Sequence, residues 1–181
     1  MTTDVMADLE TLGTNSFAVI LSIGAVKFDP FGDPEAEDAY DTFHVYVDPA
    51  SCVMHGLSMD TSTVMWWLAQ SKESQTYQTE AKRIGLPEAL AEFSKWFGDK
   101  SLPLWGNGAT FDNVILGNAY RACGMEQPWK FWDDRCYRTV KDLAPEIEIE
   151  RLGTHHNAVH DAMSQARHLQ FVYKKLFGKG A

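Results

Sequence analysis

The stretch DVMADLETLG, residues 4 to 13, places two acids, Asp8 and Glu10, inside what its other residues predict to be a β-strand. Strands favour β-branched and aromatic residues and are depleted in Asp and Glu. Residues two apart in a strand point to the same face of the sheet. Two carboxylates on one face repel each other unless a positive group lies between them. This spacing therefore predicts a metal site on the strand.

Two later acids are candidates for the same site. Asp112 follows a buried segment at the start of a predicted helix, and Asp161 lies in the first turns of the last predicted helix. Each has a structural alternative, because Asp at such positions caps a helix or interacts with its dipole. The first strand of a meander is often central in such a sheet, so later elements packed beside it could bring Asp112 and Asp161 towards Asp8. Four carboxylates in one place suit Mg²⁺ or Mn²⁺ rather than zinc. Two such cations can activate a water and stabilise the leaving oxygen of a phosphodiester.

The elements that must position these acids follow from the apolar patterns. Strands are predicted at 4–10, 18–29 and 40–48 with short connections, which favours an antiparallel meander, and a buried strand is predicted at 102–109. Apolar repeats at three and four, with Pro and Gly at the ends, predict helices. These helices are expected after Thr61 or Ser62, at 86–98, 111–124 and 132–145, and from Asn157 to Gly178. The order predicts a mixed α/β sheet in one domain, residues 1–181.

Composition narrows the class of protein. The chain has 181 residues and a net charge of −9, which argues against a protein that grips a long duplex through its phosphates. Basic residues are nevertheless concentrated in one stretch, where they form either a solvated surface or a local rim for phosphates: Arg121, Lys130, Arg135, Arg138, Lys141 and Arg151. No apolar run is long enough for a membrane helix, and no secretory signal is recognised. Three widely spaced cysteines fit a reducing cytoplasm.

Three segments resemble the motifs of a known family. DLETLG (8–13), GNGATFD (106–112) and HNAVHD (156–161) resemble the three exonuclease motifs of the DEDDh group, in the ribonuclease-H-like superfamily. The segment SIGAVKFD (22–29) also resembles the family's second strand. Within the group, the chain is most similar to a small branch with phage exodeoxyribonuclease A and a mycobacterial-type exoribonuclease. The resemblance covers residues 4 to 175 and implies a ribonuclease-H-like fold and a 3′–5′ exonuclease.

The resemblance also implies the roles of the polar residues. Asp8, Glu10, Asp112 and Asp161 would coordinate two divalent cations, Mg²⁺ or Mn²⁺, and His156 would be the general base. An imidazole can accept a proton near neutral pH when it lies within hydrogen-bond reach of the attacking water. His155 and His160 compete for this role, but only His156 precedes Asp161 by the four-residue gap of the motif. No Tyr occupies the catalytic position of the sister DEDDy group.

Substrate contacts are implied less specifically. The residues after the first motif would bind the terminal nucleotide: Leu12 would be an apolar wedge, and Thr11 or Gly13 would supply backbone contacts. Asn107 belongs to the second motif. Further candidates, each with a structural alternative, are His55, Phe111 and Trp66. Because Trp66 and Trp67 are adjacent on a helix, one is expected in the core, and the other is a candidate to stack on a base.

Alternatives stay open at this stage. The substrate is expected to be the 3′ end of single-stranded DNA, with RNA as the alternative, because a single 2′-hydroxyl separates the two. The products would be nucleoside 5′-monophosphates. A non-catalytic module that binds nucleic-acid ends, and a proofreading subunit of a polymerase, are different classes of hypothesis. A cytoplasmic location is expected, and a homodimer is possible.

Overall fold

A six-stranded sheet forms the centre of the protein in a computed structural model that describes residues 3–36, 40–79, 81–98, 100–154 and 156–178. Its strands are β1 (Asp4–Thr11), β2 (Ile20–Phe28), β3 (Asp41–Val47), β4 (Arg83–Ile84), β5 (Leu104–Gly106) and β6 (Asp134–Cys136). The helices are α1 (Pro49–Met54), α2 (Thr61–Leu68), α3 (Lys72–Thr79), α4 (Leu86–Phe97), α5 (Asp112–Ala122), the 3₁₀ turn η1 (Phe131–Asp133), α6 (Tyr137–Lys141) and α7 (Ala158–Phe177).

The sheet is mixed, with the order β4-β3-β2-β1-β5-β6. The first three strands pair antiparallel, whereas β5 pairs parallel to β1 and β6 parallel to β5. The predicted meander followed by parallel strands is therefore confirmed. This order puts β1, which carries Asp8 and Glu10, between β2 and β5 inside the sheet, where later elements can reach its acids.

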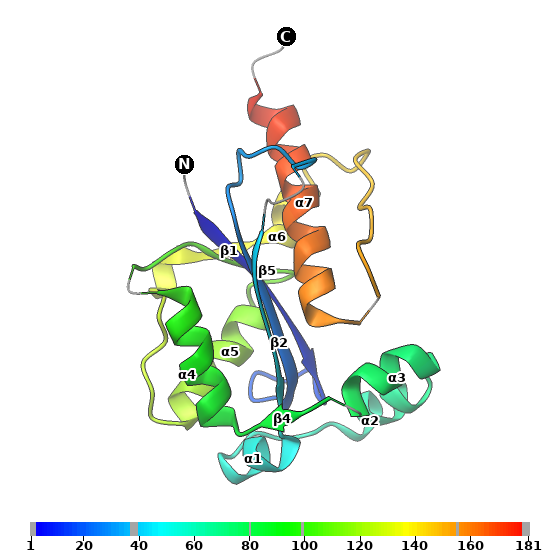
Figure 1. Cartoon of the computed structure of the whole chain (residues 1–181), viewed down its shortest axis with the longest axis vertical. Helices are drawn as coiled ribbons and strands as arrows, with labels where there is room; N and C mark the ends of the chain where they lie inside the picture. The colour runs from blue at the N-terminus through cyan, green and yellow to red at the C-terminus, as the bar shows by residue number, and fades with distance from the viewer. Residues whose placement is uncertain (1–2, 37–39, 80, 99, 155, 179–181) are drawn as a thin grey trace.

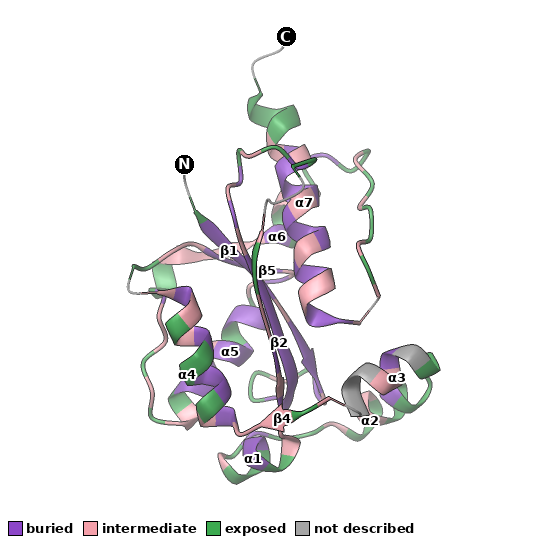
Figure 2. Ribbon diagram, in the orientation of Figure 1, coloured by how far each residue is buried: buried purple, intermediate pink, exposed green. Residues whose placement is uncertain are grey.

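Helices cover both faces of the sheet (Figure 1). On one face, α4 packs on β3 and α5 packs on β1 and β5, burying residues such as Leu90, Phe93 and Leu116. On the other face, Ala162, Ala166 and Leu169 of α7 pack on apolar side chains of the strands, as their spacing predicts. Figure 2 shows the central strands as the most continuously buried part of the ribbon. The two helical layers exclude water from the strand that carries the acids.

One predicted helix is wrong. Residues 132–145 form the end of η1, the strand β6 and the short helix α6, instead of one continuous helix. The backbone of Asp134–Cys136 pairs with Leu104–Gly106 of β5, and the Asp134 side chain accepts hydrogen bonds from Asn113 and Trp129. These tertiary contacts outweigh the helical pattern of the segment. The strand β4 and the helices α1 and α3 were not predicted.

Gly24 of β2 allows α7 to approach the sheet very closely. It is the register partner of Asp8 in the β1–β2 pair. A β-carbon at this position would overlap the backbone of Ala158 and Val159 in the first turn of α7. The lack of a side chain therefore lets the helix that carries Asp161 start directly beside Asp8.

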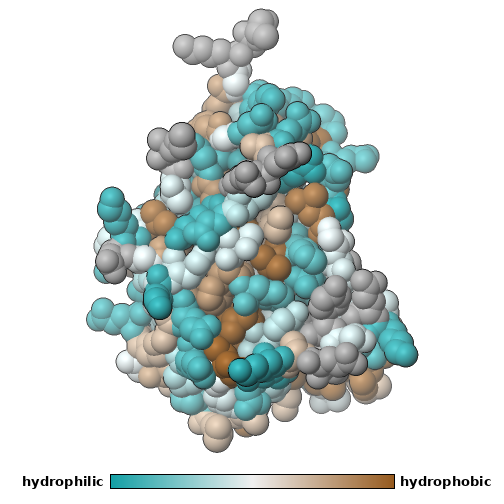
Figure 3. Space-filling view, in the orientation of Figure 1, coloured by the Kyte–Doolittle hydropathy of each residue, from teal (hydrophilic) through white to brown (hydrophobic). Residues whose placement is uncertain are grey.

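The surface carries polar side chains and also exposed apolar ones, such as Phe131 and Trp132. Figure 3 shows hydrophilic groups over most of the viewed face, with smaller apolar patches among them. Within the described residues, no helix has the length and apolar character needed to cross a membrane. The three cysteines, Cys52, Cys123 and Cys136, are free thiols.

Candidate active site

The four predicted acids meet in one cavity. Asp8 and Glu10 project from β1, Asp112 is the first residue of α5, and Asp161 lies in the first turn of α7. All four line a cavity of about 260 Å³, here called the carboxylate cavity. Three elements that are distant in sequence thus bring four carboxylates to the same space, two of them from β1.

The surroundings of Asp8 and Glu10 disfavour negative charge. Burial, followed by the nearby Asp112, Glu10 and Asp161 carboxylates, raises the pKa of Asp8 well above its usual value. Burial, followed by Asp161 and Asp112, raises the pKa of Glu10 to about 8. Buried like charges have this effect because water no longer screens them. A divalent cation in the cavity would remove this repulsion.

The carboxylate of Asp112 accepts backbone hydrogen bonds, one of them from the neighbouring strand β1. Its carboxylate oxygen Oδ1 accepts a hydrogen bond of 3.2 Å from the backbone N–H of Leu9. The N-cap of α5 is Phe111, whose side chain makes no capping hydrogen bond, so the capping alternative for Asp112 does not apply. Burial raises the pKa of Asp112 to about 7, although backbone hydrogen bonds and Arg138 act in the opposite direction.

Asp161 has two donors around it. Arg151 Nη1 lies 2.6 Å from Asp161 Oδ1, and the backbone N–H of His156 donates to Asp161 Oδ2 over 3.0 Å. The N-cap of α7 is Asn157, whose side chain accepts from the backbone N–H of His160. Asp161 is therefore free of a capping role and faces the cavity.

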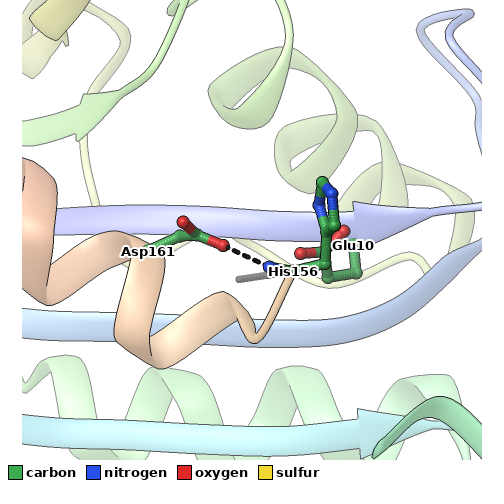
Figure 4. A group of neighbouring side chains, drawn as sticks. All are labelled: Glu10, His156 and Asp161. Carbon is green, nitrogen blue, oxygen red and sulfur yellow. Dashed lines mark hydrogen bonds between the residues drawn. The ribbon is translucent and has the colours of Figure 1, made fainter. Parts of the chain in front are cut away.

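His156 lies directly before α7, with its ring beside the acids (Figure 4). Its imidazole, Glu10 and Asp161 each offer one ligand atom, and these atoms lie within 4.8 Å of one another. The ring packs edge-on against Trp66 and Trp67, with centroids 5.0 and 5.8 Å away. The backbone φ of His156 is 60°, a left-handed conformation that few residues with a side chain adopt.

His160, the second histidine of the third motif, has different surroundings from His156. The His160 ring packs over Gly153, and its Nδ1 accepts from the backbone N–H of Thr154 at 3.0 Å. It therefore supports the loop that precedes His156 and points away from the acids, as its helical spacing predicts. His155 lies outside the described residues.

A second cavity of about 430 Å³ adjoins the acids and is here called the tryptophan cavity. Thr11, Gly13 and Trp66 line it, together with Leu9, Glu10 and Phe111, which it shares with the carboxylate cavity. Trp66 is half-exposed. Trp67 is buried, and its Nε1 donates to the carbonyl of Thr11 over 2.9 Å. The expected division between one core and one accessible Trp is therefore seen.

Two predicted substrate residues lie apart from these walls. Leu12 is half-buried against the apolar core and is not in the lining of either cavity. His55 ends α1, where its Nδ1 lies 2.8 Å from the carbonyl oxygen of Ser51, and it also lines neither cavity. Asn107 does line the carboxylate cavity.

Gln165 was not predicted at the site, whereas Arg138 and Arg151 belong to the basic stretch that was a candidate rim for phosphates. Gln165 donates from Nε2 to Asp8 Oδ1 over 2.8 Å, and its buried Oε1 has no partner among the described residues. Arg138 lies at the rim, where its Nη2 donates to the carbonyl of Asn107 over 2.8 Å. Arg151 pairs with Asp161. Gln165 could have been found, because it follows Asp161 by one helical turn and so shares its face of α7.

The comparisons with known proteins agree with this geometry. A family model described as the 3′–5′ exoribonuclease Rv2179c-like domain matches residues 3–173. The chain belongs to the Rv2179c-like family. A curated exodeoxyribonuclease of Enterobacteria phage T4 is 22% identical over 210 aligned positions, which cover 97% of this chain and 91% of the phage protein.

Solved structures share the fold. The nuclease domain of 3′hExo, a DEDDh family member bound to rAMP, superposes with a TM-score of 0.62 at 13% identity, covering 98% of this chain and 94% of that domain. An E. coli exonuclease I complex with single-stranded DNA also has a TM-score of 0.62, at 15% identity, covering 98% of this chain but only 41% of exonuclease I. The ribonuclease-H-like fold is therefore confirmed.

Together, these findings establish the class of enzyme. The Rv2179c-like chain is a 3′–5′ exonuclease of the DEDDh group, as its motifs indicated. The group implies dependence on divalent metal ions, and the chemistry of the cavity fits such ions. The cavity offers carboxylate oxygens, which hard cations prefer as ligands. Among the described residues that line it, the only Arg or Lys side chains that could balance these negative charges are Arg138 and Arg151.

Proposed function

We propose that this Rv2179c-like exonuclease removes single nucleotides from the 3′ end of single-stranded nucleic acid with two divalent cations, Mg²⁺ or Mn²⁺. The proposed ligands are Asp8, Glu10, Asp112 and Asp161. The observation that carries the proposal is the meeting of these four acids, three of them buried and Asp8 half-buried, which repel one another unless cations neutralise them. Asp8 would hold the cations together with the other three acids, whose carboxylates all act on it.

The cations would lower the pKa of a water and neutralise charge on the leaving oxygen. The chain's own contribution begins with His156, the proposed general base, which accepts a proton from the attacking water. The water oxygen forms a bond to the last phosphorus, the bond from phosphorus to the 3′ oxygen of the preceding nucleotide breaks, and that oxygen takes a proton. The released product is a nucleoside 5′-monophosphate.

The tryptophan cavity is the proposed site of the terminal nucleoside. It adjoins the acids through Leu9 and Glu10, so a nucleoside there places its 5′-phosphate at the carboxylates. Trp66 offers a half-exposed aromatic face for the base, and Thr11 and Gly13 form the wall after β1. Leu12 lies behind this wall, so its proposed contribution is to hold the Thr11–Gly13 backbone in place.

The sugar of the substrate is proposed from the relatives. Similarity to the phage exodeoxyribonuclease, which aligns with 97% of the chain, supports DNA as the first candidate substrate. The family description, an exoribonuclease domain, favours RNA as the second candidate. Because the 2′-hydroxyl is the difference, a direct comparison of the two substrates decides between them.

The test is a cleavage assay on 5′-labelled single-stranded DNA and RNA of one sequence, with Mg²⁺, Mn²⁺ or EDTA. The proposal expects a ladder that shortens from the 3′ end, requires metal and is lost in Asp8→Asn. The exposed-surface variant Glu92→Gln on α4 is the matched control and should retain the ladder. Full activity in EDTA, or in Asp8→Asn, would overturn the proposal.

Three further hypotheses concern the whole protein. Residues 1–181 are proposed to form one domain, supported by the single sheet to which all the strands belong. A cytoplasmic location is proposed because the three cysteines are free thiols. A homodimer stays a hypothesis that light scattering coupled to size exclusion would test.

A further inference from the structure

A third cavity adjoins the acids on the side away from the tryptophan cavity. It has a volume of about 280 Å³ and is here called the α6 cavity, because Tyr137 and Lys141 of α6 line it. It shares Asn107, Arg151 and Gln165 with the carboxylate cavity, but it shares no lining residue with the tryptophan cavity. The three cavities therefore form a series with the four acids in the middle.

Such a series fits the chemistry of a strand that ends in the site. The scissile phosphate has a nucleoside on each side, and only the nucleoside upstream of it carries a second phosphate. The described lining of the tryptophan cavity includes no Lys or Arg. The α6 cavity has Lys141, and Arg138 lies one helical turn away at the rim of the carboxylate cavity. Side chains three apart on a helix share a face, so the positive side chains of Arg138 and Lys141 can both lie along one nucleic-acid strand.

The charges around Lys141 leave its ammonium group available. No ion pair of Lys141 is found among the described residues. The other cation of the cavity, Arg151, is paired with Asp161, and the cavity's acid, Asp142, is exposed to solvent. Lys141 is therefore the cation of this cavity best placed to meet a phosphate.

Buried polar atoms also point to a ligand at the junction of the two cavities. Asn107 Oδ1 and Gln165 Oε1 are buried without a hydrogen-bond partner among the described residues, and both residues line both cavities. Unsatisfied acceptors of this kind are costly. A nucleoside offers hydroxyl and amino donors to them, while Pro145, Ile147 and Ile149 provide an apolar wall for its sugar or base.

We propose that the α6 cavity binds the penultimate nucleotide of the substrate, with Arg138 near the scissile phosphate and Lys141 at the next phosphate upstream. The proposal rests on the proposed function, because it assigns a second subsite to the same strand. It implies that recognition extends one phosphate beyond the bond that is cut. It also fixes the direction of the strand, from α6 towards α2.

The test compares a dinucleotide with and without a 5′-phosphate, which is the group that Lys141 would bind. For the wild type, the 5′-phosphate should lower KM about tenfold, the scale of one hydrogen bond to a charged group. In Lys141→Gln this ratio should fall to about one. Lys95→Gln, an exposed lysine of α4 on the other face of the sheet, is the matched control and should keep the wild-type ratio.

A second readout uses a longer oligonucleotide. The plot of log KM against log salt concentration should lose a slope of about 0.7 in Lys141→Gln, the value for one phosphate contact on a single strand, and none in Lys95→Gln. A wild-type ratio near one, or a ratio and slope unchanged in Lys141→Gln, would overturn the subsite. Failure of the wild type to cleave any substrate with metal would instead overturn the proposed function.

Discussion

Replacing Glu10 with Gln should stabilise the metal-free protein at alkaline pH. In the folded chain the pKa of Glu10 is raised to about 8, mainly by burial and then by Asp161 and Asp112, whereas the ordinary value is 4.5. Between these two values the folded state binds a proton that the unfolded state has released. The free energy of unfolding therefore falls as the pH rises through this window, and it stops falling above the folded pKa.

The size of the effect follows from the two pKa values. Each unit of pKa difference is worth about 1.4 kcal/mol. Going from pH 5.5 to pH 8.5 covers most of the window, so Glu10 alone should cost the wild type about 3 kcal/mol over this range. For a chain of this length, that free energy corresponds to about 6 to 12 °C in Tm. In Glu10→Gln this loss should be absent, because the amide does not titrate.

The assay is thermal unfolding in EDTA at both pH values, followed by circular dichroism. The drop in Tm between the two should be smaller in Glu10→Gln than in the wild type by about 6 to 12 °C. Glu92→Gln, an exposed acid on α4, is the control and should match the wild type. Added Mg²⁺ should reduce the wild-type drop, because bound cations keep the carboxylates ionised. An equal drop in wild type and Glu10→Gln would refute the reasoning.

Five other substitutions have defined outcomes. Asp8→Asn should lower cleavage at least about a thousandfold while the fold is retained, as judged by circular dichroism, and Mg²⁺ should raise its Tm far less than that of the wild type. His156→Ala should lower kcat about 10²- to 10⁴-fold, with metal binding retained as measured by calorimetry. His160→Ala should lower kcat less than about tenfold. A larger loss in His160→Ala than in His156→Ala would show that His156 is not the general base. Gln165→Leu removes the donor to Asp8, so it should weaken Mn²⁺ binding about 10- to 100-fold in a titration, and an unchanged affinity would contradict a positioning role. Trp66→Ala should raise KM for an oligonucleotide about five- to 150-fold if the ring stacks on the terminal base, and a change in kcat alone would argue against stacking.

The strongly periodic elements could be predicted from the sequence. The strands β1 to β3 have dense apolar patterns, and α4 and α7 repeat apolar residues at three and four, so their positions follow from burial on one face. The strand β6 could not be predicted in this way. It has three residues, and its existence depends on pairing with β5 and on the contacts of Asp134, which lie far apart in sequence.

The residues of the site likewise differ in whether the local sequence makes them predictable. Asp8 and Glu10 are unusual because acids at period two are rare in strands, so the sequence itself marks them. The basic stretch that contains Arg138 and Arg151 was open to two interpretations, a solvated surface or a rim for phosphates, because nothing in the sequence indicates that α6 and the loop before α7 end at the acids. Leu12 and His55 matched family patterns, yet neither lines the two cavities at the acids, because burial in the core and the end of α1 determine their positions.

Because of the contact at Gly24, the distance between the acids of the site does not depend on how tightly the rest of α7 packs on the sheet. Where α7 begins, it meets the sheet through backbone atoms, so no side chain lies between Gly24 and Ala158. The two elements cannot move closer at this point, whatever residues fill the core farther along the helix. Substitutions at Ala166 or Leu169 can therefore change how firmly α7 is held while leaving the separation of Asp8 and Asp161 nearly constant. Core redesign could make the enzyme more heat-resistant without retuning its acids, whereas one methyl group at position 24 would push them apart.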